Sequence, residues 1–566
     1  MNITFNQKTY RWMITAECVM AAVGTVFILV HHTSCSWMIL SLLLISSALN
    51  IWICRKCDLI RRSVLWHAIQ MTQTGIFLFL DQQFAVLTFY SGVSVLLECL
   101  LFGSTLVCYY GAIIRKWRVE TLFLTIAIPY GVFMSLSLPV KSVPDEIAHI
   151  YTSYHMADHM LQIEDTDDNS FSIRQQDWVF LSAPIEYENS KELMNEIYKT
   201  ALAESYESVI EQDAEVCLNG NEVAYVLSAA GIAAGQLLNW NAFWTLNAGR
   251  MMNLLQYVLL IYLAIKVMPS LKLVPFTVSL LPMAMQQGMS YSYDSLVIGL
   301  SIFTVCGAYG LKRCLSSDRK KSVMYGSLLI LSGLVLSSMK SHSYIFVAIV
   351  PLIVLLSDNR LFRRILVWIL RVMIACVLIF AVYMVVDVLF DIKPLFSVPV
   401  NPIAWQDGAQ GYTIQYFLNE PFDLLLVYAR TVVVYTHFYI RSAISDYLAW
   451  LSIRTPLVFV PLFLLFCFAA AREEKTDYIN QTEKRYYIVM AMITVASIVM
   501  GLLLAWTPVG TGVSLGVQGR YFLPLFVPFF LVFNKGASRF QGCGKYLPAT
   551  YALTLMVFSI CLITRF

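Results

Sequence analysis

Two adjacent carboxylates are the sharpest chemical feature of this sequence. Asp145 and Glu146 lie in the segment Ser142–His149, directly after a long apolar run. A carboxylate at such an exit could act as a general base or hold a metal ion. His149 follows Asp145 by four residues, so both would share one face of a helix. The same acids would also stabilise a helix N-terminus, where the helix dipole favours negative charge. The residue spacing does not distinguish this structural interpretation from the functional one.

Four other ionisable residues are expected at the same outer membrane boundary, namely Arg250, Asp294, Lys340 and Arg520. Ionisable groups at membrane depth are functional candidates by default. Because these four lie at helix ends, interfacial anchoring and structural ion pairing are the competing interpretations. Acids and several bases that face one cavity would suit a phosphate-bearing ligand together with a proton acceptor.

Two further groups could in principle bind a metal. His155, Asp158 and His159 have i, i+4 spacing, which suits a metal site, but a wet interfacial helix explains them as well. Cys54 and Cys57 form a CxxC pair among basic residues with no second pair, so a redox or metal role is disfavoured. We therefore expect no dedicated metal site.

The elements that must position these residues are membrane helices. Of the 566 residues, 58% are hydrophobic and only 13% are charged, whereas soluble chains carry about 25% charged residues. Runs of about 20 apolar residues match the bilayer thickness, and in lipid such runs must be helical. The net charge of +3 is too small to indicate a nucleic-acid partner. The fold class expected is an all-α polytopic membrane protein.

About fifteen apolar runs are visible, which predicts about 13–15 transmembrane helices. They lie near residues 12–31, 36–54, 64–80, 86–114, 119–139, 246–268, 273–290, 295–311, 322–339, 343–357, 364–390, 449–471, 486–505, 521–534 and 546–564.

Basic clusters set the expected orientation of these runs. Each cluster follows an even-numbered run, so all fall on one face, which is cytoplasmic by the positive-inside rule, as is the N-terminus. The clusters are Arg55–Arg62, Arg115–Arg118, Lys312–Lys321, Arg360–Arg364, Arg472–Arg485 and Lys535–Lys545.

Two long loops are then external, at residues 140–246 and 391–447. Amphipathic helices on the outer membrane surface are predicted within them over Asp145–Gln162 and Tyr412–Arg430, and an interfacial or re-entrant helix over Ala224–Trp240. The expected division of the chain is an N-terminal four-helix extension (1–118), a core with both loops (119–534), and a cytoplasmic link with a last helix (535–566).

The sequence resembles the bacterial polytopic membrane proteins catalogued as domain of unknown function 2142, which are placed with the GT-C glycosyltransferases. The resemblance covers roughly Glu120–Asn534. It is carried, in family order, by Pro144–His149, Asn247–Arg250, Leu280–Met283, Ser292–Leu296 and Gln518–Pro524.

The resemblance implies a GT-C-like core with an external active site and an acidic catalytic base. Asp145 matches that base, with Glu146 beside it, and Arg520 is the candidate for holding the donor phosphate. Lys340 and Arg250 are weaker candidates for that role. The remaining residues expected to bind substrate are Asp294, His149, Gln518 and Tyr521.

One departure from the family concerns a histidine. Many relatives carry a His-Pro-Pro-like segment where this chain has residues 219–225, which hold no histidine. If that histidine has a role, this chain either lacks it or supplies it from elsewhere, with His149, His155 and His437 as the candidates.

The function expected is an inverting glycosyltransferase that moves a sugar from a polyprenyl-phosphate donor to a glycan or lipid-linked acceptor at the external face of the bacterial plasma membrane. The donor must arrive within the membrane lipid, since nucleotide sugars are absent outside. No cofactor is required, because Arg and Lys can neutralise a monophosphate, although a divalent cation (Mg²⁺ or Mn²⁺) is compatible.

Three alternatives remain open at this point. A transporter or flippase of lipid-linked glycan would use Asp387 and Arg371, but internal repeats typical of transporters are not visible. A non-enzymatic scaffold would tolerate loss of Asp145. A polysaccharide polymerase or ligase is closer in class to the transferase.

Overall fold

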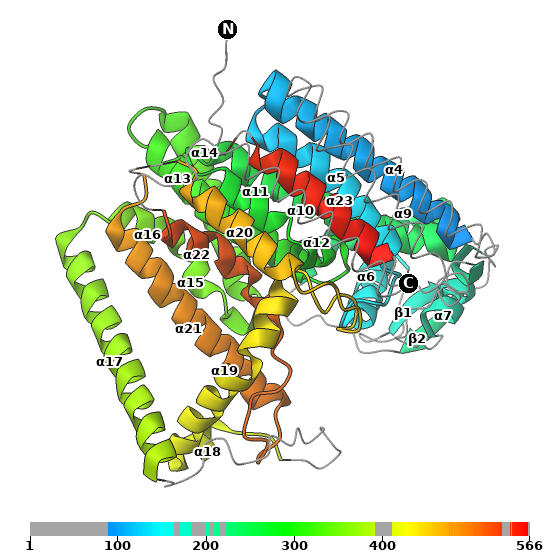
Figure 1. The fold of residues 1–566 in the computed structure, drawn as a ribbon. Helices are drawn as coiled ribbons and strands as arrows, with labels where there is room; N and C mark the ends of the chain where they lie inside the picture. The colour runs from blue at the N-terminus through cyan, green and yellow to red at the C-terminus, as the bar shows by residue number, and fades with distance from the viewer. Residues whose placement is uncertain are drawn as a thin grey trace, which may run out of the picture.

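We describe the protein from a computed structural model, in which the described residues are 89–163, 170–182, 199–202, 209–213, 222–390, 410–474, 476, 478–534, 544 and 546–563. The first three apolar runs and the Cys54–Cys57 pair lie outside these residues. Helices dominate what is described and form a tilted bundle with two projecting parts (Figure 1).

Five of the described helices are long and apolar enough to cross a membrane. All five coincide with predicted runs, which confirms a helical membrane protein. They are α5 (Val119–Ser137), α10 (Ala242–Val267), α13 (Asp294–Cys314), α14 (Arg319–Ser338) and α21 (Gln481–Trp506).

Helix α13 is the centre of the bundle. It is buried from Asp294 to Leu311 and packs against α10, α14 and α16 (Val350–Leu356). Its first residue, Asp294, therefore lies inside the protein rather than at a lipid-facing end, at the helix terminus where a negative charge is favoured by the helix dipole.

Three predicted continuous runs are each split into two short helices. The run at 273–290 forms α11 (Leu273–Ser279) and α12 (Pro282–Met289). The run at 343–357 forms α15 (Ile345–Ala348) and α16, and the run at 521–534 forms the 3₁₀ helix η4 (Gly519–Leu525) followed by α22 (Phe526–Val532). A proline lies in α12, α16 and η4, and proline removes a backbone donor that a continuous helix would need.

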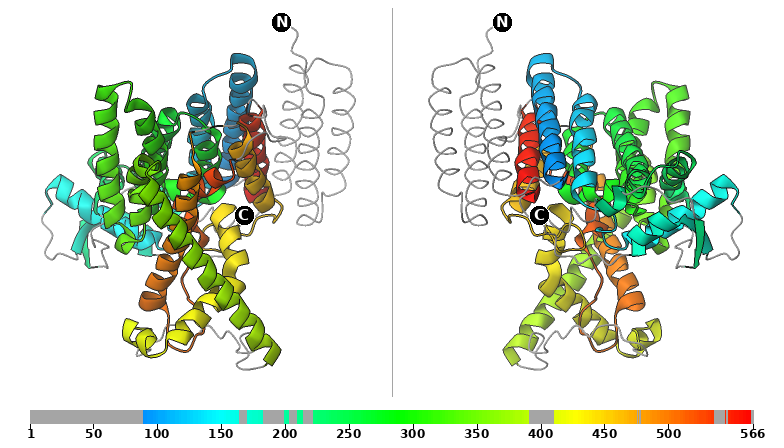
Figure 2. Two further views of the ribbon diagram at one scale, coloured as in Figure 1. Left: turned by 90° about the vertical axis from the view of Figure 1, so that its left-hand side faces the viewer. Right: turned by 90° about the vertical axis from the view of Figure 1, so that its right-hand side faces the viewer.

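The segment between α5 and α10 forms a small unit beside the bundle (Figures 1 and 2). It contains α6 (Glu146–Leu161), β1 (Ser170–Arg174), α7 (Gln175–Ser182), β2 (Val209–Asp213), η2 (Glu222–Ala224) and α9 (Val226–Leu237). β1 and β2 pair antiparallel, with Ser170 opposite Asp213. The described chain is mostly helical, as predicted, and this two-stranded sheet is an addition that the sequence did not indicate.

Helix α6 is present where it was predicted, but protein covers its polar face. His149, Thr152, Ser153, His155 and Asp158 are all buried, and α6 packs on α9 and β1. An interfacial helix would leave such side chains exposed to water at the membrane surface. The polar residues of α6 thus serve contacts within the protein.

Glycines allow α9 to lie close to α10. A Cβ on Gly231 would come within 2.7 Å of the backbone of Ala248, and one on Gly235 within 2.7 Å of Thr245 Oγ1. This spacing of small residues lets membrane helices approach closely. Helix α9 is accordingly a packed part of the protein that links α6 to α10.

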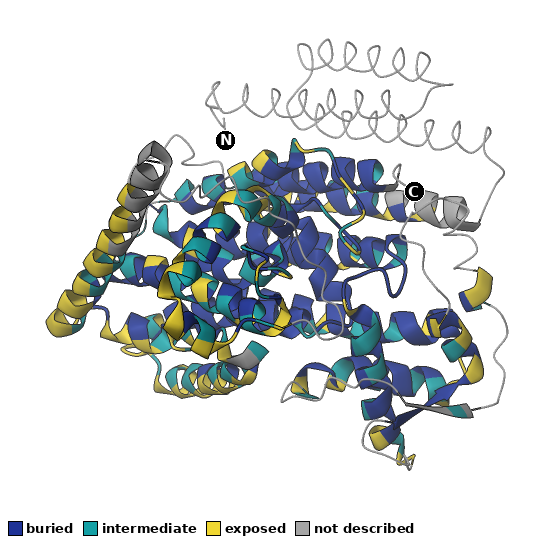
Figure 3. Ribbon diagram, turned by 90° about the horizontal axis from the view of Figure 1, so that it is seen from below, coloured by how far each residue is buried: buried dark blue, intermediate teal, exposed yellow. Residues whose placement is uncertain are grey.

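A second part of the chain projects below the bundle (Figure 1). It contains α17 (Arg360–Phe390), α18 (Ile414–Asn419) and α19 (Pro421–Ile444), together with the lower end of α21. The predicted helix over Tyr412–Arg430 is thus replaced by two, and the second continues to Ile444. Figure 3 shows α17 as largely exposed, and its exposed side chains include Leu361, Trp368 and Leu378, a surface that suits lipid.

The remaining helices close the bundle on one side. α4 (Phe89–Tyr109) continues as the π-helix η1 (Tyr110–Arg115) and packs on α5 and on the last helix, α23 (Leu547–Ile563). α20 (Phe459–Arg472) packs on α11. The end of the predicted N-terminal extension and the C-terminal helix therefore lie side by side (Figures 1 and 2).

Candidate functional site

Asp145 is the N-cap residue of α6 and has a left-handed backbone, with φ of 64°. Its carboxylate makes no capping hydrogen bond to the helix. It accepts a hydrogen bond of 2.8 Å from Arg520 Nη2, and its side chain is 56% exposed. The simple capping interpretation of Asp145 therefore does not apply, because the carboxylate turns toward Arg520.

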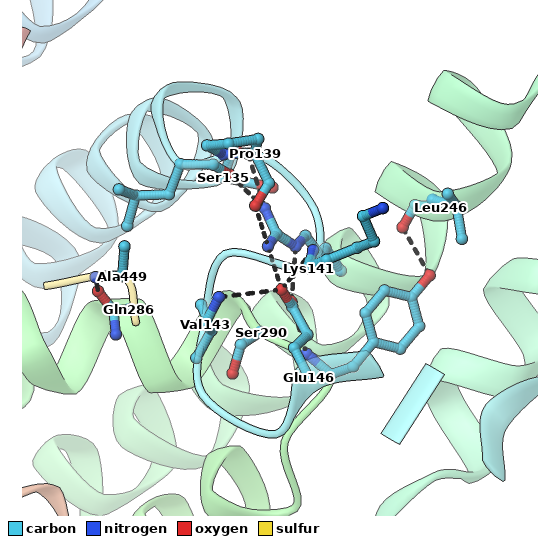
Figure 4. A network of polar contacts seen from close by, with 12 residues as sticks. Ser135, Pro139, Lys141, Val143, Glu146, Leu246, Gln286, Ser290 and Ala449 are labelled. Carbon is cyan, nitrogen blue, oxygen red and sulfur yellow. Dashed lines mark hydrogen bonds and ion pairs between the residues drawn. The ribbon is translucent and has the colours of Figure 1, made fainter. Parts of the chain in front are cut away.

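Glu146 has a different environment, although it is the next residue. Its side chain is fully buried and forms an ion pair with the equally buried Arg250, with Nη2 and Oε2 2.5 Å apart. The backbone N–H groups of Lys141 and Tyr291 also donate to Glu146, over 2.9 and 3.3 Å. Figure 4 shows the Glu146 carboxylate inside the loop that precedes α6.

Arg250 uses all its donors in the same loop. Nε and Nη2 bind Glu146, and the other N–H groups donate to the carbonyl oxygens of Ser135, Leu138 and Pro139. A guanidinium has five donors, so none remains for a ligand. Arg250 and Glu146 thus join α10 to the end of α5 and hold the loop that presents Asp145.

The buried Arg520 and Asp294 form a group with the partly buried Lys340 beside Asp145. Lys340 Nζ lies 2.5 Å from Asp294 Oδ1, and Arg520 Nε lies 3.8 Å from Asp294 Oδ2. Arg520 Nε has no hydrogen-bond partner, although it is buried. With Asp145 included, two carboxylates face two cations, so an anionic ligand would compete with the carboxylates for Arg520 and Lys340.

Aromatic rings surround the two cations. Lys340 Nζ lies 4.0 Å from the ring centre of Tyr521 and 5.1 Å from that of Tyr293. The Tyr521 carbonyl accepts a hydrogen bond from Tyr344 over 2.8 Å. Such rings favour a cation while excluding water. Lys340 itself has φ of 46°, a left-handed backbone found at Asp145 as well.

His149 faces the same group from α6. Its Nδ1 lies 2.7 Å from the Tyr225 hydroxyl, and its ring lies 5.1 Å from that of Tyr293. Burial lowers the pKa of His149 to about 4; Asp145 and Asp294 oppose this shift, and Arg520 and Lys340 add to it. The imidazole is therefore neutral at pH 7. Tyr225 ends the segment 219–225, so His149 lies against that segment.

Gln518, the N-cap residue of η4, and Tyr521, within η4, lie on either side of Arg520 in the sequence. Gln518 lines a pocket together with Arg520, and the Tyr521 hydroxyl accepts a 3.4 Å hydrogen bond from Arg520 Nη2. Gly519 lets η4 approach α19, because a Cβ there would clash with the Tyr439 carbonyl and the Ala443 N–H. The glycine in this motif thus positions the neighbouring Arg520.

The histidines of α6 do not assemble a metal site. No group of three or more His, Cys, Asp or Glu side chains suitable for a metal occurs among the described residues. His155 Nδ1 pairs with the Ser170 carbonyl at 2.9 Å, and Asp158 accepts from the Ser172 N–H at 2.6 Å. His155 and Asp158 therefore attach α6 to β1.

Of the predicted site residues, the structure brings Asp145, His149, Asp294, Lys340, Arg520 and Tyr521 together, with Gln518 at the pocket beside them. Glu146 and Arg250 form a separate buried pair. Sequence reasoning missed Tyr225, Tyr293, Tyr344, Gln286 and Gln287. The two glutamines gave a usable signal, since an amide pair inside an apolar run is costly to bury.

Asp387 and Arg371 were the residues expected to serve a transporter. Both belong to α17. The Arg371 side chain is exposed, and that of Asp387 lies outside the described side chains.

Comparison with known proteins gives one match. The family model described as "Predicted membrane protein (DUF2142)" matches residues 128–528, a range that contains every residue of the group. No curated protein and no solved structure matches the chain.

Proposed function

The chain belongs to the DUF2142 family of predicted membrane proteins, and from that premise we propose that it is a membrane-embedded glycosyltransferase of GT-C type. The donor is a polyprenyl-phosphate sugar, and the acceptor is a hydroxyl of a surface glycan or lipid-linked glycan. Transfer takes place at the external face of a bacterial plasma membrane. The observation that carries the proposal is the exposed carboxylate of Asp145, hydrogen-bonded to the buried guanidinium of Arg520.

In this proposal Asp145 is the general base. It takes the proton of the acceptor hydroxyl, whose oxygen forms a bond to the anomeric carbon of the sugar. The bond from that carbon to the phosphate oxygen breaks, and its electron pair leaves with the polyprenyl phosphate. A single displacement of this kind inverts the anomeric centre. Of the two adjacent acids, Asp145 suits the role because it is exposed and Glu146 is fully buried.

Arg520 and Lys340 are suited to stabilise the leaving phosphate. Buried cations in a preorganised group act most strongly where charge develops in the transition state. The free Nε–H of Arg520 offers a donor for a phosphate oxygen. Asp294 keeps both cations in place between turnovers.

Donor binding would also release the base. Without a donor the Asp145 carboxylate is held by Arg520 Nη2 at 2.8 Å. A phosphate that takes over part of the Arg520 guanidinium would free this carboxylate for the acceptor hydroxyl.

A divalent cation is not required in this scheme, because two side-chain cations serve the phosphate. If Mg²⁺ or Mn²⁺ does bind, Asp145 and Asp294 are the carboxylates beside the expected phosphate position. Chelator should therefore leave transfer unchanged, and a loss that Mg²⁺ or Mn²⁺ restores would add the ion to the scheme.

A flippase of lipid-linked glycan is the second candidate, and one observation favours it. Broken helices are typical of transporters, and two of the broken pairs, α11–α12 and η4–α22, lie next to the cluster or contain part of it. A flippase would move the donor without breaking the sugar–phosphate bond, so bond cleavage separates the two functions.

The deciding experiment uses the purified full chain in detergent with a panel of radiolabelled polyprenyl-phosphate sugars and lipid-linked glycan acceptors. We expect release of polyprenyl phosphate by the wild type, and a loss of about 100-fold or more in Asp145→Asn. Asp318→Asn is the matched control, since Asp318 caps α14 and asparagine caps equally well. Absence of release from every donor, with full cellular function of Asp145→Asn, would overturn the transferase proposal.

A further inference from the structure

Arg441, in the last turn of α19, and Arg454, in the loop that leads to α20, share one buried carboxylate. Asp446 Oδ2 accepts hydrogen bonds from Arg441 Nε, at 2.9 Å, and from Arg441 Nη2. Asp446 Oδ1 accepts from Arg454 Nε at 3.4 Å and from the Thr455 N–H at 2.9 Å. Two positive charges therefore face a single negative one, and the side chains of Arg441 and Arg454 are 22% and 45% exposed.

An aromatic ring also holds the two guanidinium groups. The guanidinium carbon of Arg454 lies 3.8 Å from the ring centre of Tyr447, and that of Arg441 lies 5.0 Å from it. The ring of Phe438 packs edge-on against Tyr447, with the ring centres 4.8 Å apart. Stacking on a ring restricts the orientation of a planar guanidinium. The two cations are therefore ordered before any ligand arrives.

Backbone contacts fix the loop that carries Tyr447 and Arg454. Leu448 and Ile453 exchange two hydrogen bonds, at 3.0 and 3.2 Å. Tyr447 has φ of 58°, in the left-handed region that non-glycine residues rarely adopt. Such a backbone persists where the surrounding structure enforces it, and it is found most often at functional sites. The loop is thus built to hold Tyr447 and Arg454 in one arrangement.

The charge and the donors of this pair are only partly used. Two like charges held close together repel each other, and one carboxylate compensates only one of them. Nη1 of Arg441 and both terminal nitrogens of Arg454 have no hydrogen-bond partner among the described residues. A guanidinium binds phosphate through two parallel hydrogen bonds. A phosphate group would therefore supply both the missing charge and the missing acceptors.

The surroundings of the pair suit a phosphate that is attached to a lipid. Ile440 precedes Arg441, Leu457 follows Arg454 by three residues, and both are exposed apolar side chains. Trp450, in the same loop, is exposed as well, and tryptophan is enriched where membrane proteins meet the membrane–water boundary. A free phosphate gains nothing from such side chains, whereas the chain of a lipid can pack on them.

The pair also lies close to the group around Asp145. Ser442, the residue after Arg441, accepts a hydrogen bond of 3.1 Å from the N–H of Gly519, the residue before Arg520. Arg520 is the residue proposed to hold the donor phosphate, and it contacts Asp145. A second cationic site next to that one would serve the other substrate.

We propose that Arg441 and Arg454 bind the phosphate that joins the acceptor glycan to its own lipid. The acceptor is then a lipid-linked, phosphate-bearing glycan rather than a free polysaccharide. The phosphate anchors the acceptor while one of its sugar hydroxyls reaches Asp145, and the phosphate itself is not altered. This inference rests on the proposed function, because it assigns the second substrate of that transfer.

The test measures ligand binding to the full chain in nanodiscs of a neutral phospholipid. The ligands are a disaccharide joined to polyprenol through a diphosphate, the same disaccharide joined to polyprenol without phosphate, and the donor, a polyprenyl-phosphate sugar. Phosphatidylglycerol is added as a competing anionic lipid. The variants are Arg454→Gln and, as the control, Arg363→Gln, which removes an exposed arginine from α17.

We expect the wild type to bind the diphosphate-linked disaccharide about tenfold more tightly than the phosphate-free one, because hydrogen bonds to charged groups are the stronger ones. Arg454→Gln should lose most of this preference and bind the donor as before. It should keep its thermal midpoint, since Asp446 retains Arg441 and the Thr455 N–H. Arg363→Gln should keep the preference.

The acceptor site and the proposed function fail in different ways. An unchanged preference in Arg454→Gln, an equal loss of donor binding, or displacement of the disaccharide by an equimolar amount of phosphatidylglycerol would each overturn the acceptor site and leave the transferase proposal standing. Binding that depends on Arg454, without transfer from any donor, would overturn the transferase proposal and keep a lipid-phosphate site.

Discussion

Arg520 donates a hydrogen bond of 2.8 Å to Asp145, a residue 375 positions earlier in the chain. The arginine is buried and the carboxylate is exposed. This contact joins the loop after α5 to η4 near the C-terminus. It also separates Asp145 from Glu146, whose partner is Arg250. The two adjacent acids therefore have different partners and different roles.

Removing the charge of Glu146 should damage stability, whereas removing that of Asp145 should not. Glu146→Gln leaves Arg250 buried with its charge uncompensated, which costs about 3–5 kcal/mol in comparable buried pairs. Asp145→Asn changes an exposed partner, so the loss should stay within about 1 kcal/mol. Thermal unfolding of both variants in one detergent measures this. Equal losses of stability in the two variants would contradict the assignment of Glu146 to a buried structural pair and of Asp145 to an exposed site.

A double substitution should show that Lys340 stabilises the protein mainly by compensating the charge of Asp294. Lys340→Met alone leaves Asp294 with Arg520 Nε at 3.8 Å as its remaining cation, so the protein should lose several kcal/mol of stability. Adding Asp294→Asn should restore most of that stability, because the uncompensated charge is gone.

The transfer rate of the double variant shows whether Lys340 is only structural or also binds the phosphate. If Lys340 stabilises the leaving phosphate, the double variant remains at least about 100-fold slower than the wild type although it is folded. Recovery of transfer together with stability would limit Lys340 to a structural role.

Arg520 should not be replaceable by lysine. Its guanidinium contacts the Pro144 carbonyl and Asp145 together, and a lysine ammonium does not reproduce this planar fork. Arg520→Lys should raise KM for the donor and lower kcat, with a combined loss of about 100-fold or more in kcat/KM. Steady-state kinetics with a varied donor concentration measures both. Wild-type kinetics in this variant would show that charge alone suffices.

Adding one methyl group at Gly519 should disturb the site without touching a charged residue. Gly519→Ala places a Cβ against the Tyr439 carbonyl and Ala443 N–H, so η4 must shift and Arg520 with it. Overpacking of this kind costs about 1–3 kcal/mol of stability. The transfer rate should fall by more than this destabilisation explains, because Arg520 moves as well. Gly326→Ala on α14 is the control, since nothing lies within 4 Å of a Cβ there. Equal effects at both glycines would contradict the packing argument.

His149 should stay neutral well below pH 6.5. Burial lowers its pKa from 6.5 to about 4, so the unfolded chain binds a proton between these values that the folded chain does not. Stability from the neutral histidine is complete above about pH 6.5 and is lost as the pH falls toward 4, by about 3 kcal/mol. NMR of ring-labelled histidine gives the pKa directly, with His149→Gln to assign the signal. A value near 6.5 would disprove the buried, neutral state.

The positions of the long helices were predictable from the sequence. Hydropathy over about 20 residues measures transfer into lipid, and lipid forces such runs to be helical. This locates α5, α10, α13, α14 and α21 within a few residues. The helix that begins after Asp145 also followed from local signals. The breaks in the runs at 273–290, 343–357 and 521–534 did not follow from hydropathy, which is similar on both sides of each break. The prolines of α12, α16 and η4 were the local signal that hydropathy does not register.

The candidate site was likewise predictable from the sequence only in part. Residue types and their expected side of the membrane selected Asp145, Asp294, Lys340 and Arg520 before any contact was known. Residue type and spacing could not distinguish Asp145 from Glu146, since adjacent acids lie at nearly the same distance from the membrane run, and only the family resemblance favoured Asp145. Tertiary structure alone decided this. Arg250 lies 104 residues from Glu146 and Arg520 lies 375 residues from Asp145. Packing of distant helices therefore determines which acid is buried with a cation and which one remains exposed.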